Sequence, residues 1–393
     1  MIDYNSLLTP EITSLKPSGI RKFFSISETM QDVISLGVGE PDFKTPWNVR
    51  NVAIDTLEKG RTWYSANAGL KELRIEISKY MERRFHVSYD PMEEVLVTVG
   101  GSEALDLCIR ALISPGDEVL LPEPCFVAYA LIVTLSHGKV IPIHTRVENA
   151  FRFTAEDLKK AITPRTKLLV LPYPNNPTGA VLRRKHLEEI AAVLRETNVM
   201  VLSDEIYAEL TYSGQHVSIA SLPGMQERTV VVNGFSKTYA MTGWRLGYAV
   251  GPAPIIRQMT KLHQYAIMCA PTTSQYAAIE ALRNCDDSVR MMVEEYDVRR
   301  RFLVNAFNKM GLYCFMPEGA FYVFPDIRST GLSSEEFCEK LLYSQRVATI
   351  PGNAFGECGE GFIRVSYAYS INHLTDAVER IKIFLAGLQA PNA

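Results

Sequence analysis

Seven short apolar runs between about residues 95 and 251 restrict the possible folds of this chain more than any other feature. Within each run the apolar residues are nearly continuous, whereas a strand with one solvated face would alternate apolar and polar residues. Helical patterns separate several of the runs. Continuous runs are typical of strands buried on both faces, and their alternation with helices indicates a mainly parallel α/β sheet. The runs lie at residues 95–99, 118–124, 139–144, 167–174, 198–205, 229–235 and 246–251.

The pattern changes after about residue 275. A long charged segment, residues 286–310, has the pattern of a helix, and the short apolar runs 320–325 and 361–368 follow it. Helices and short strands in this order favour a second, smaller α+β domain. Near the N-terminus, the segment SLGVGEPDF at residues 35–43 has the turn chemistry of a crossing between domains.

We therefore expect two domains in this chain of 393 residues, since ordinary domains have about 100–200 residues. The larger, an α/β domain, would span residues 46–280. The smaller, an α+β domain, would combine residues 1–45 with residues 281–393, the first segment packing against the last.

Charge and cysteine content argue against several classes of protein. The net charge is -3 with both signs interspersed, so no basic stripe indicates binding to nucleic acid or to an anionic membrane. The seven cysteines include no CxxC pair and the seven histidines no HExxH motif, so neither a disulfide framework nor a metal centre is expected. We see no secretion signal and no apolar run of the roughly 18 residues that span a bilayer. We expect a soluble cytoplasmic protein.

Polar residues gather where the predicted strands end, which is where open α/β sheets bind ligands. After the first run, Gly101 and Ser102 open a helix, whose free backbone N–H groups and dipole suit an anion. Asn176 follows the fourth run, and Asp204 and Tyr207 lie at the end of the fifth. Each residue also has an ordinary structural explanation, because glycine and asparagine are common in turns and serine and aspartate are common helix N-caps.

The stretch FSKTYAMTGWRLGY, residues 235–248, favours a ligand over these structural explanations. It follows the sixth run and holds Ser236, Lys237 and Arg245 among aromatic and small residues. Cations in such surroundings are costly unless an anion or a covalent partner accompanies them. An amine, a strand-end carboxylate, an anion site and the nearby ring of Phe126 together suit pyridoxal phosphate, which forms a Schiff base with lysine and needs an acidic partner for its ring nitrogen.

Six motifs occur along nearly the whole chain: SLGVGEPDF, WYSANAGL, NNPTG, SDEIY, SKTYAMTGWRLGY and FIRVSYA. In this order they resemble the motifs of the fold-type-I aminotransferases of class I and II. The segment SGIRKF followed by VISLGVGEPDF is most similar to the bacterial and archaeal branch that holds aspartate and aromatic aminotransferases and an acetyl-diaminopimelate aminotransferase. The resemblance implies the α/β fold of type I PLP-dependent transferases, with a mainly parallel seven-stranded sheet flanked by helices and a smaller α+β domain.

The resemblance also implies a role for each matching cofactor residue. Lys237 would hold pyridoxal 5'-phosphate as a Schiff base and later move a proton, helped by a pKa that burial and nearby cations lower. Asp204 would pair with the ring nitrogen, while Tyr207 and Asn176 would hydrogen-bond the phenolic oxygen. Phe126 would stack on the ring. The phosphate would be held by Gly101, Ser102, Ser236 and Arg245.

Further implied roles concern the substrate and the quaternary structure. Arg364, in FIRVSYA, would bind the substrate α-carboxylate through two parallel hydrogen bonds, a geometry that lysine cannot copy. Alternation along this strand places its side chain on the face opposite its sequence neighbours. Gly39 and Asn176 would add contacts to the substrate. Tyr64 would reach the phosphate of a neighbouring subunit, which implies a homodimer with shared active sites.

These roles describe an aminotransferase. An amino acid would leave its amino group on the cofactor and depart as a 2-oxo acid, and a second 2-oxo acid, 2-oxoglutarate by family habit, would collect it. A carbon–sulfur β-lyase is the alternative, because it would use Lys237, Asp204 and Arg364 and then eliminate a thiol. A regulator fused to a DNA-binding module is disfavoured by the slightly acidic charge and by the lack of a spare N-terminal segment for such a module.

The sequence leaves the amino donor open. An acidic side chain would need a second cation, which Arg21 or Lys22 would supply, whereas an aromatic or aliphatic side chain would need an apolar pocket lined by Ile20, Phe24 and Tyr322. We expect an aromatic or acidic amino acid first and an acetylated diaminopimelate second.

Glu103 bears on the same choice. It stands where some relatives carry lysine or glutamine near the substrate, which weakens a simple aspartate assignment. A glutamate there would favour an amino-bearing substrate or would point into solvent.

Overall fold

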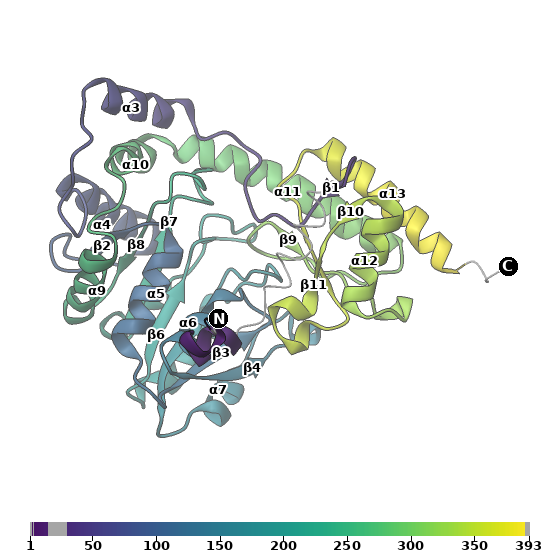
Figure 1. Cartoon of the computed structure of the whole chain (residues 1–393), viewed down its shortest axis with the longest axis horizontal. Coiled ribbons are helices and arrows are strands. Elements are labelled where there is room, and N and C mark those ends of the chain that lie inside the picture. The colour runs from purple at the N-terminus through teal and green to yellow at the C-terminus, as the bar shows by residue number, and fades with distance from the viewer. Residues whose placement is uncertain (1, 3, 15–29, 390–393) are drawn as a thin grey trace.

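The computed structural model describes residues 2, 4–14 and 30–389, and its centre is a seven-stranded sheet (Figure 1). The strand order is β2-β8-β7-β6-β5-β3-β4. β8 runs antiparallel to both of its neighbours, and every other pair is parallel. The predicted mainly parallel sheet and its seven strands are confirmed. Their bounds are β2 (Val95–Thr98), β3 (Glu118–Glu123), β4 (Lys139–His144), β5 (Thr166–Leu171), β6 (Met200–Asp204), β7 (Thr229–Gly234) and β8 (Gly247–Val250).

Burial explains why most of the strands are continuous apolar runs in the sequence. Every residue of β2, β7 and β8 is buried, and so are most residues of β3, β5 and β6. The prediction of burial on both faces was wrong for β4, where only Ile143 of the six residues is buried. β4 lies at one edge of the sheet, and the rest of the protein covers its faces less completely there.

Helices cover both faces of the sheet. One apolar core joins one face to α5, α6 and α9 through residues such as Leu105, Val133 and Met259. The other core joins the opposite face to α4, α8 and α10, and it continues into the C-terminal part of the chain. The helices of the sheet layer are α3 (Trp47–Glu58), α4 (Lys71–Phe85), α5 (Gly101–Leu112), α6 (Ala128–Leu135), α7 (Ala155–Ala161), α8 (Arg184–Arg195), α9 (Ala253–Ala266) and α10 (Thr272–Asn284).

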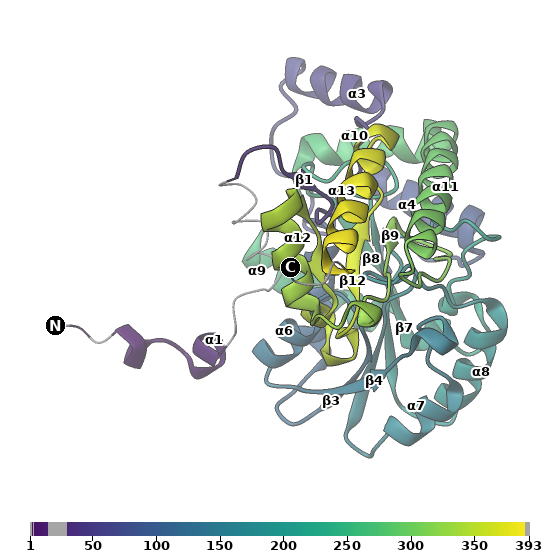
Figure 2. The ribbon, with the colours of Figure 1, turned by 90° about the vertical axis from the view of Figure 1, so that its right-hand side faces the viewer.

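The C-terminal part of the chain combines long helices with two small sheets. Helix α11 (Asp286–Lys309) confirms the helix predicted over residues 286–310, and α13 (Ile371–Gln389) packs against both α11 and α12 (Ser334–Gln345) (Figure 2). One sheet is antiparallel, in the order β11-β12-β9. In the other, β1 from the N-terminal part pairs in parallel with β10. The strands are β1 (Ile34–Ser35), β9 (Tyr322–Val323), β10 (Val347–Ala348), β11 (Ile350–Pro351) and β12 (Ile363–Ser366).

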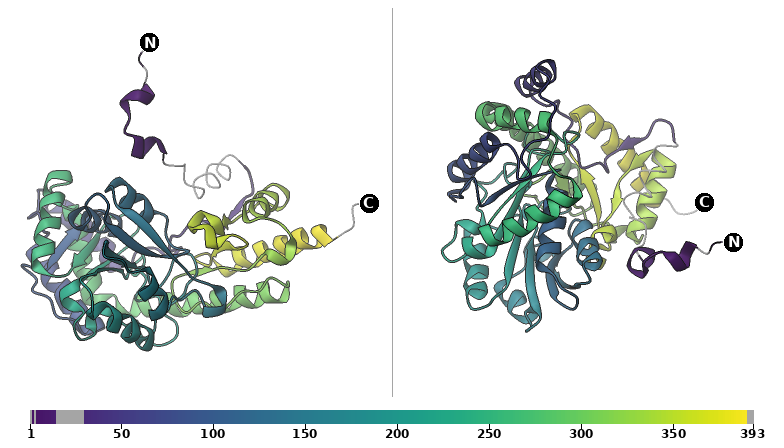
Figure 3. Two further views of the ribbon diagram at one scale, coloured as in Figure 1. Left: turned by 90° about the horizontal axis from the view of Figure 1, so that it is seen from below. Right: turned by 60° about the vertical axis from the view of Figure 1, so that its left-hand side comes forward.

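Short helices complete the described elements. Helix η1 (Tyr4–Leu7) extends away from the body of the protein, while α1 (Pro10–Ser14) approaches α6, with Glu11 Oε1 3.4 Å from His137 Nδ1 (Figure 3). None of the helices in the described part of the chain is long and apolar enough to cross a membrane. The remaining 3-10 helices are η2 (Val147–Asn149), η3 (Ile219–Ser221), η4 (Gln226–Arg228), η5 (Arg328–Thr330), η6 (Gly352–Phe355) and η7 (Glu357–Gly359).

Candidate active site

A cavity of about 320 Å³ lies at the carboxyl ends of the parallel strands. Its walls come from the segments that follow β2, β3, β5, β6 and β7, from β12, and from residues 38–39. The position is the one expected for a ligand site in an open α/β sheet. Every predicted site residue except Tyr64 lines this cavity: Gly39, Gly101, Ser102, Phe126, Asn176, Asp204, Tyr207, Ser236, Lys237, Arg245 and Arg364.

Lys237 follows β7 and contributes an amine to the cavity. Its Nζ donates a hydrogen bond of 2.6 Å to the carbonyl oxygen of Gly39. Burial is the main reason that the pKa of this amine falls to about 8; Arg364 and Arg245 act in the same direction, and the Glu40 carboxylate opposes them. Near neutral pH the unprotonated amine is therefore far more abundant than it would be for a solvated lysine, so it is available as a nucleophile or a base.

Asp204 ends β6 and is buried. Its Oδ2 accepts a hydrogen bond of 2.6 Å from the hydroxyl of Tyr129, and its Oδ1 accepts one of 3.2 Å from the backbone N–H of Ile206. Burial raises the pKa of this carboxyl to about 6, and the two hydrogen bonds limit the rise. No cationic side chain in the described part of the chain contributes to that pKa. A cationic group on a ligand would provide the compensation that a buried carboxylate requires.

Tyr129, which donates a hydrogen bond to Asp204, was not predicted from the sequence. It lies in the first turn of α6, and its ring packs edge-on against that of Phe126, with the centroids 5.8 Å apart. Burial raises the pKa of its hydroxyl well above the usual value, so the group remains a proton donor to Asp204. Phe126 lies before the N-cap residue of α6, so helical spacing in EPCFVAY does not by itself predict this contact.

The start of α5 forms a cradle for an anion. The helix begins at Gly101, so the free N–H groups and the positive end of the helix dipole lie at the cavity wall. Gly100 has a φ of +82°, and a Cβ there would stand 2.6 Å from Nη2 of Arg245. Glycine is thus needed for this loop to approach the guanidinium closely. The hydroxyl-bearing residues Ser102 and Ser236 also line the cavity.

Glu103 links the loop before α5 to helix α9. Its Oε2 accepts a hydrogen bond of 2.5 Å from the backbone N–H of Val99, and its Oε1 lies 2.7 Å from Nδ1 of His263 on α9. The carboxylate therefore faces neither a substrate nor solvent, contrary to both expectations. The packing of α5 against α9, which the sequence alone does not reveal, holds it inside the protein.

Arg364 lies on β12 and is only 4% exposed. Its Nη1 donates a hydrogen bond of 2.9 Å to Oδ1 of Asn176, and its Nη2 donates to the carbonyl oxygen of Gly37. Its Nε has no hydrogen-bond partner among the described residues. The guanidinium carbon lies 4.6 Å from the ring centroid of Tyr322 and 4.8 Å from that of Phe355. An anionic ligand would complete the environment of this buried cation.

Tyr207 and Tyr322 contribute hydroxyl groups to the cavity that Lys237 and Arg364 also line. The hydroxyl oxygens of Tyr207 and Tyr322 are 2.9 Å apart, and burial raises the pKa of both groups. A Cβ at Gly39 would stand 2.1 Å from the Tyr322 hydroxyl oxygen, so glycine is needed at that position. The expectation of an apolar role for Tyr322 was incomplete, because its hydroxyl faces the polar groups of the site.

Some predicted residues lie elsewhere. Tyr64 is in the loop between α3 and α4, is 75% exposed and is absent from the cavity wall of its own chain. The proposed specificity residues Ile20, Arg21, Lys22 and Phe24 lie outside the described residues.

Known proteins match both the sequence and the fold. The sequence model of the family described as "Aminotransferase class I and II" matches residues 31–381. The chain belongs to this family. This chain is 53% identical over 380 residues to the protein of Bacillus subtilis strain 168 named "Putative aminotransferase YugH", with 97% of this chain and 98% of that protein covered. It is 46% identical over 378 residues to a Pyrococcus abyssi protein named aspartate aminotransferase, with 95% and 97% covered.

A solved structure gives the same result for the fold. The crystal structure of the aromatic aminotransferase from Pyrococcus horikoshii OT3 superposes on this aminotransferase with a TM-score of 0.89 at 44% identity, covering 94% of this chain and 99% of that one. The predicted fold class and family are therefore confirmed. All three of these similar proteins are named as aminotransferases or described as such, and nothing among them favours the lyase.

The cavity fits the cofactor of this family, pyridoxal phosphate. A buried carboxylate that lacks a cation, Asp204, suits a protonated ring nitrogen. The glycine cradle beside Arg245 suits a phosphate, and Lys237 supplies the amine for a Schiff base. The chain is a PLP-dependent aminotransferase, as the sequence predicted.

Proposed function

We propose that this aminotransferase moves the amino group of an aromatic or acidic L-amino acid to 2-oxoglutarate or a similar 2-oxo acid, with an acetylated diaminopimelate as the second class of donor. The observation that carries the proposal is Arg364, a buried guanidinium that lines the same cavity as the Lys237 amine. Nη1 and Nη2 each have a second N–H besides the one that bonds Asn176 or Gly37, and such paired donors suit the carboxylate that amino acids and 2-oxo acids have in common. The similar proteins named for aspartate and aromatic donors support this choice of substrate classes.

Lys237 would carry the proton. Its Nζ, with a pKa of about 8, accepts the proton that the donor loses from its Cα and returns it when the acceptor is aminated. The carbonyl oxygen of Gly39, 2.6 Å away, holds the amine on the side of the cavity that Arg364 and Tyr322 also line. Pyridoxal phosphate, when bound, supplies the electron sink that makes the Cα proton acidic.

The remaining residues would hold and tune the cofactor. Asp204 would pair with the ring nitrogen, and the 2.6 Å hydrogen bond from Tyr129 would fix the carboxylate and favour its ionised form. Tyr207 and Asn176 would bind the phenolic oxygen, and Phe126 would stack on the ring. The phosphate would lie in the cradle made by Gly101, Ser102, Ser236 and Arg245.

Two substrate-binding roles complete the proposal. Arg364 would bind the α-carboxylate, with Asn176 orienting its guanidinium through the 2.9 Å hydrogen bond. Gly39 would contribute backbone contacts to the same group. The cofactor would occupy Lys237 and Arg245, and the α-carboxylate would occupy Arg364. The side-chain carboxylate of an acidic amino donor would therefore need a further cation from outside the residues that line the cavity, and we propose Arg21 or Lys22.

A donor panel tests the substrate assignment. kcat/KM would be measured with 2-oxoglutarate for aspartate, glutamate, phenylalanine, tyrosine and an acetylated diaminopimelate, with alanine as the reference. The proposal expects an acidic or aromatic donor to exceed alanine by at least tenfold, which is about 1.4 kcal/mol of discrimination in the transition state. A panel in which alanine equals or exceeds all of them would refute the assignment of the donor.

We also propose a homodimer in which Tyr64 of one subunit completes the site of the other. Three apolar side chains are exposed on neighbouring loops: Trp63 at 61%, Tyr64 at 75% and Met268 at 44%. The two loops are joined by a hydrogen bond from the Asn67 side chain to the carbonyl oxygen of Met268. A second hollow, of about 570 Å³, shares Arg245 with the active-site cavity and would admit a tyrosine from a partner. Sedimentation analysis tests this: a monomer with full activity would rule out the shared site.

Domain division and location remain proposals as well. We propose a large domain of residues 46–280 and a small domain of residues 1–45 with 281–393, supported by the pairing of β1 with β10. We propose a cytoplasmic enzyme, in keeping with seven unpaired cysteines.

A further inference from the structure

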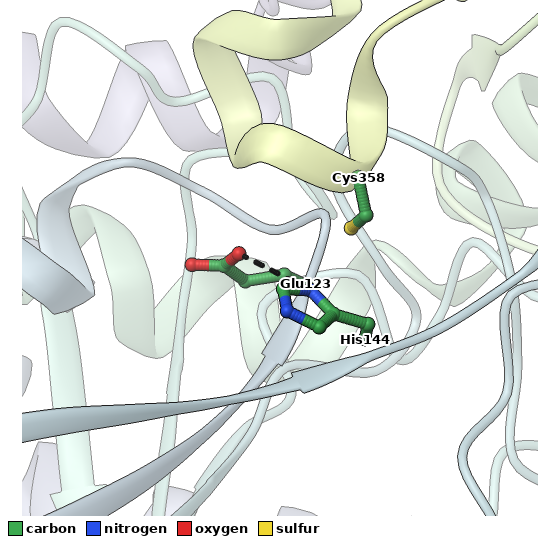
Figure 4. Close-up of side chains that lie close together, drawn as sticks. All are labelled: Glu123, His144 and Cys358. Carbon is green, nitrogen blue, oxygen red and sulfur yellow. Dashed lines mark ion pairs between the residues drawn. The ribbon is translucent and has the colours of Figure 1, made fainter.

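Glu123, His144 and Cys358 bring three metal-ligating atoms together outside the active-site cavity (Figure 4). A carboxylate oxygen, an imidazole nitrogen and the thiol sulfur all lie within 4.8 Å of one another. Glu123 ends β3 and His144 ends β4, and the two residues are partners in the parallel register of these strands. Cys358 comes from η7, more than two hundred residues later in the chain.

The spacing of the three atoms suits a tetrahedral ion. Zinc bonds of about 2.0–2.3 Å at tetrahedral angles place the ligand atoms about 3.3–3.8 Å apart. The distance from Glu123 Oε2 to His144 Nδ1 is 3.9 Å, close to that range. The largest separation between two of the three ligand atoms, at most 4.8 Å, would have to shorten by about 1 Å on binding, and the His144 side chain is 52% exposed.

The backbone is built for the close approach of η7 to Glu123. Gly356 has a φ of +129°, and a Cβ at this position would stand 2.7 Å from Glu123 Oε2. Both the positive φ and the close approach to Glu123 favour glycine at position 356. The Glu123 side chain is only 17% exposed, and in the described part of the chain His144, at 3.9 Å, is its ion-pair partner. The negative charge of a carboxylate that is so little exposed is poorly balanced by a partner 3.9 Å away, and a bound cation would balance it.

The surroundings provide room and negative charge. A cavity of about 560 Å³, enough for an ion and its water, is lined by His144 and Cys358 but not by Glu123, and its acidic residues are Glu148, Glu357 and Glu360. Its lining includes the cations Arg146 and Arg328 as well, of which Arg328 is engaged with Asp326.

We propose that Glu123, His144 and Cys358 bind one Zn²⁺ ion per chain, with water as the fourth ligand. The set of one thiolate, one imidazole and one carboxylate suits zinc, whereas Mg²⁺ and Ca²⁺ prefer oxygen ligands alone. Binding converts the thiol to a thiolate and releases its proton to solvent. The sequence did not indicate this site, since ligands at positions 123, 144 and 358 form no recognisable motif.

The ion would tie the C-terminal sheet to the active-site wall. β3 leads directly to Phe126, and η7 leads directly to β12, which carries Arg364. Zinc would thus fix the segments that hold the proposed ring-stacking and carboxylate-binding residues relative to one another. We expect it to raise the thermal stability of the holoenzyme.

Zinc binding to the holoenzyme tests the proposal. The protein would be freed of metal by dialysis against a chelator, titrated with ZnCl₂ by calorimetry, and assayed for retained zinc by elemental analysis after desalting. The ligand variants are Glu123→Gln, His144→Asn and Cys358→Ser. The matched control is Cys269→Ser, because Cys269 and Cys358 are the two cysteines that are not buried.

We expect one zinc per chain at roughly micromolar Kd or tighter in the wild type and in Cys269→Ser. Each ligand variant should bind at least ~10-fold more weakly, since even outer-shell changes at metal sites cost about 10–100-fold. Zinc should raise the Tm of the wild type but not of Cys358→Ser, and MgCl₂ should not substitute. Zinc binding that is equal in the wild type and in all three ligand variants, or no retained zinc in the wild type, would overturn the proposal.

Discussion

Replacing Arg364 with lysine isolates the geometry of carboxylate binding from its charge. In the wild type Nη1 donates to Asn176 and Nη2 to the Gly37 carbonyl, and each of these two nitrogens has a second N–H for a substrate carboxylate. A lysine ammonium carries its three donors on one atom, so it cannot keep these contacts and also form a two-pronged bond to a substrate. The variant therefore loses at least one hydrogen bond between charged groups, worth about 1.5–3 kcal/mol.

That loss corresponds to a decrease of about 10–150-fold in kcat/KM, since 1.36 kcal/mol is tenfold. The change should fall mainly on KM, and for the amino donor and the 2-oxo acid alike, because both carry the carboxylate in the ground state and in the transition state. Steady-state kinetics with both substrates varied measures it. Arg165→Lys is the control, as Arg165 is an exposed arginine paired with Glu118 far from the cavity wall. A KM within twofold of the wild type for both substrates would refute the role of Arg364.

Three other predictions follow from the site. Lys237→Ala should abolish turnover while circular dichroism shows an unchanged fold, and a variant with full activity would contradict the assignment of the amine. Tyr129→Phe should raise the pKa of Asp204, because it removes the hydrogen bond that limits it to about 6, so the acid limb of kcat/KM should move to higher pH; an unmoved limb would count against the coupling. In the cofactor-free protein, Lys237 has a pKa of about 8 against 10.5 in a solvated lysine, so between those values this residue binds more protons in the unfolded chain and its contribution to stability should rise with pH. Chemical denaturation of the cofactor-free wild type and Lys237→Met should show that the difference between their free energies of unfolding changes with pH in favour of the wild type over this range, and a constant difference would exclude the lowered pKa.

Much of the fold was predictable because its signals are local. The seven strands are continuous apolar runs, and the switch to α11 is marked by a long charged segment. β4 deviates because its burial depends on what covers the sheet edge, and a single run of residues carries no information about that. The two-residue strands β1 and β10 likewise depend on each other across more than three hundred residues.

The site was predictable to the extent that its residues sit at strand ends. Lys237 and Asn176 each follow a recognisable run and Asp204 lies at the end of one, and the fold brings those strand ends to one cavity. The positions of Tyr129 and Glu103 depend instead on how the helices pack. The Tyr129 hydroxyl on α6 donates a hydrogen bond to Asp204 on β6, and the Glu103 carboxylate on α5 contacts His263 on α9. Contacts between elements that are distant in the sequence cannot be inferred from either element alone.

The central claim, amino-group transfer by the Lys237 site, is tested most directly in a single half-reaction. The holoenzyme would be mixed with one amino acid and no 2-oxo acid, and the cofactor absorbance and all products would be followed. The account predicts a stoichiometric change of the cofactor to its aminated form, with one 2-oxo acid released per site and no further reaction until an acceptor is added. Continuous release of ammonia, with the starting spectrum restored, would contradict it and would identify a lyase.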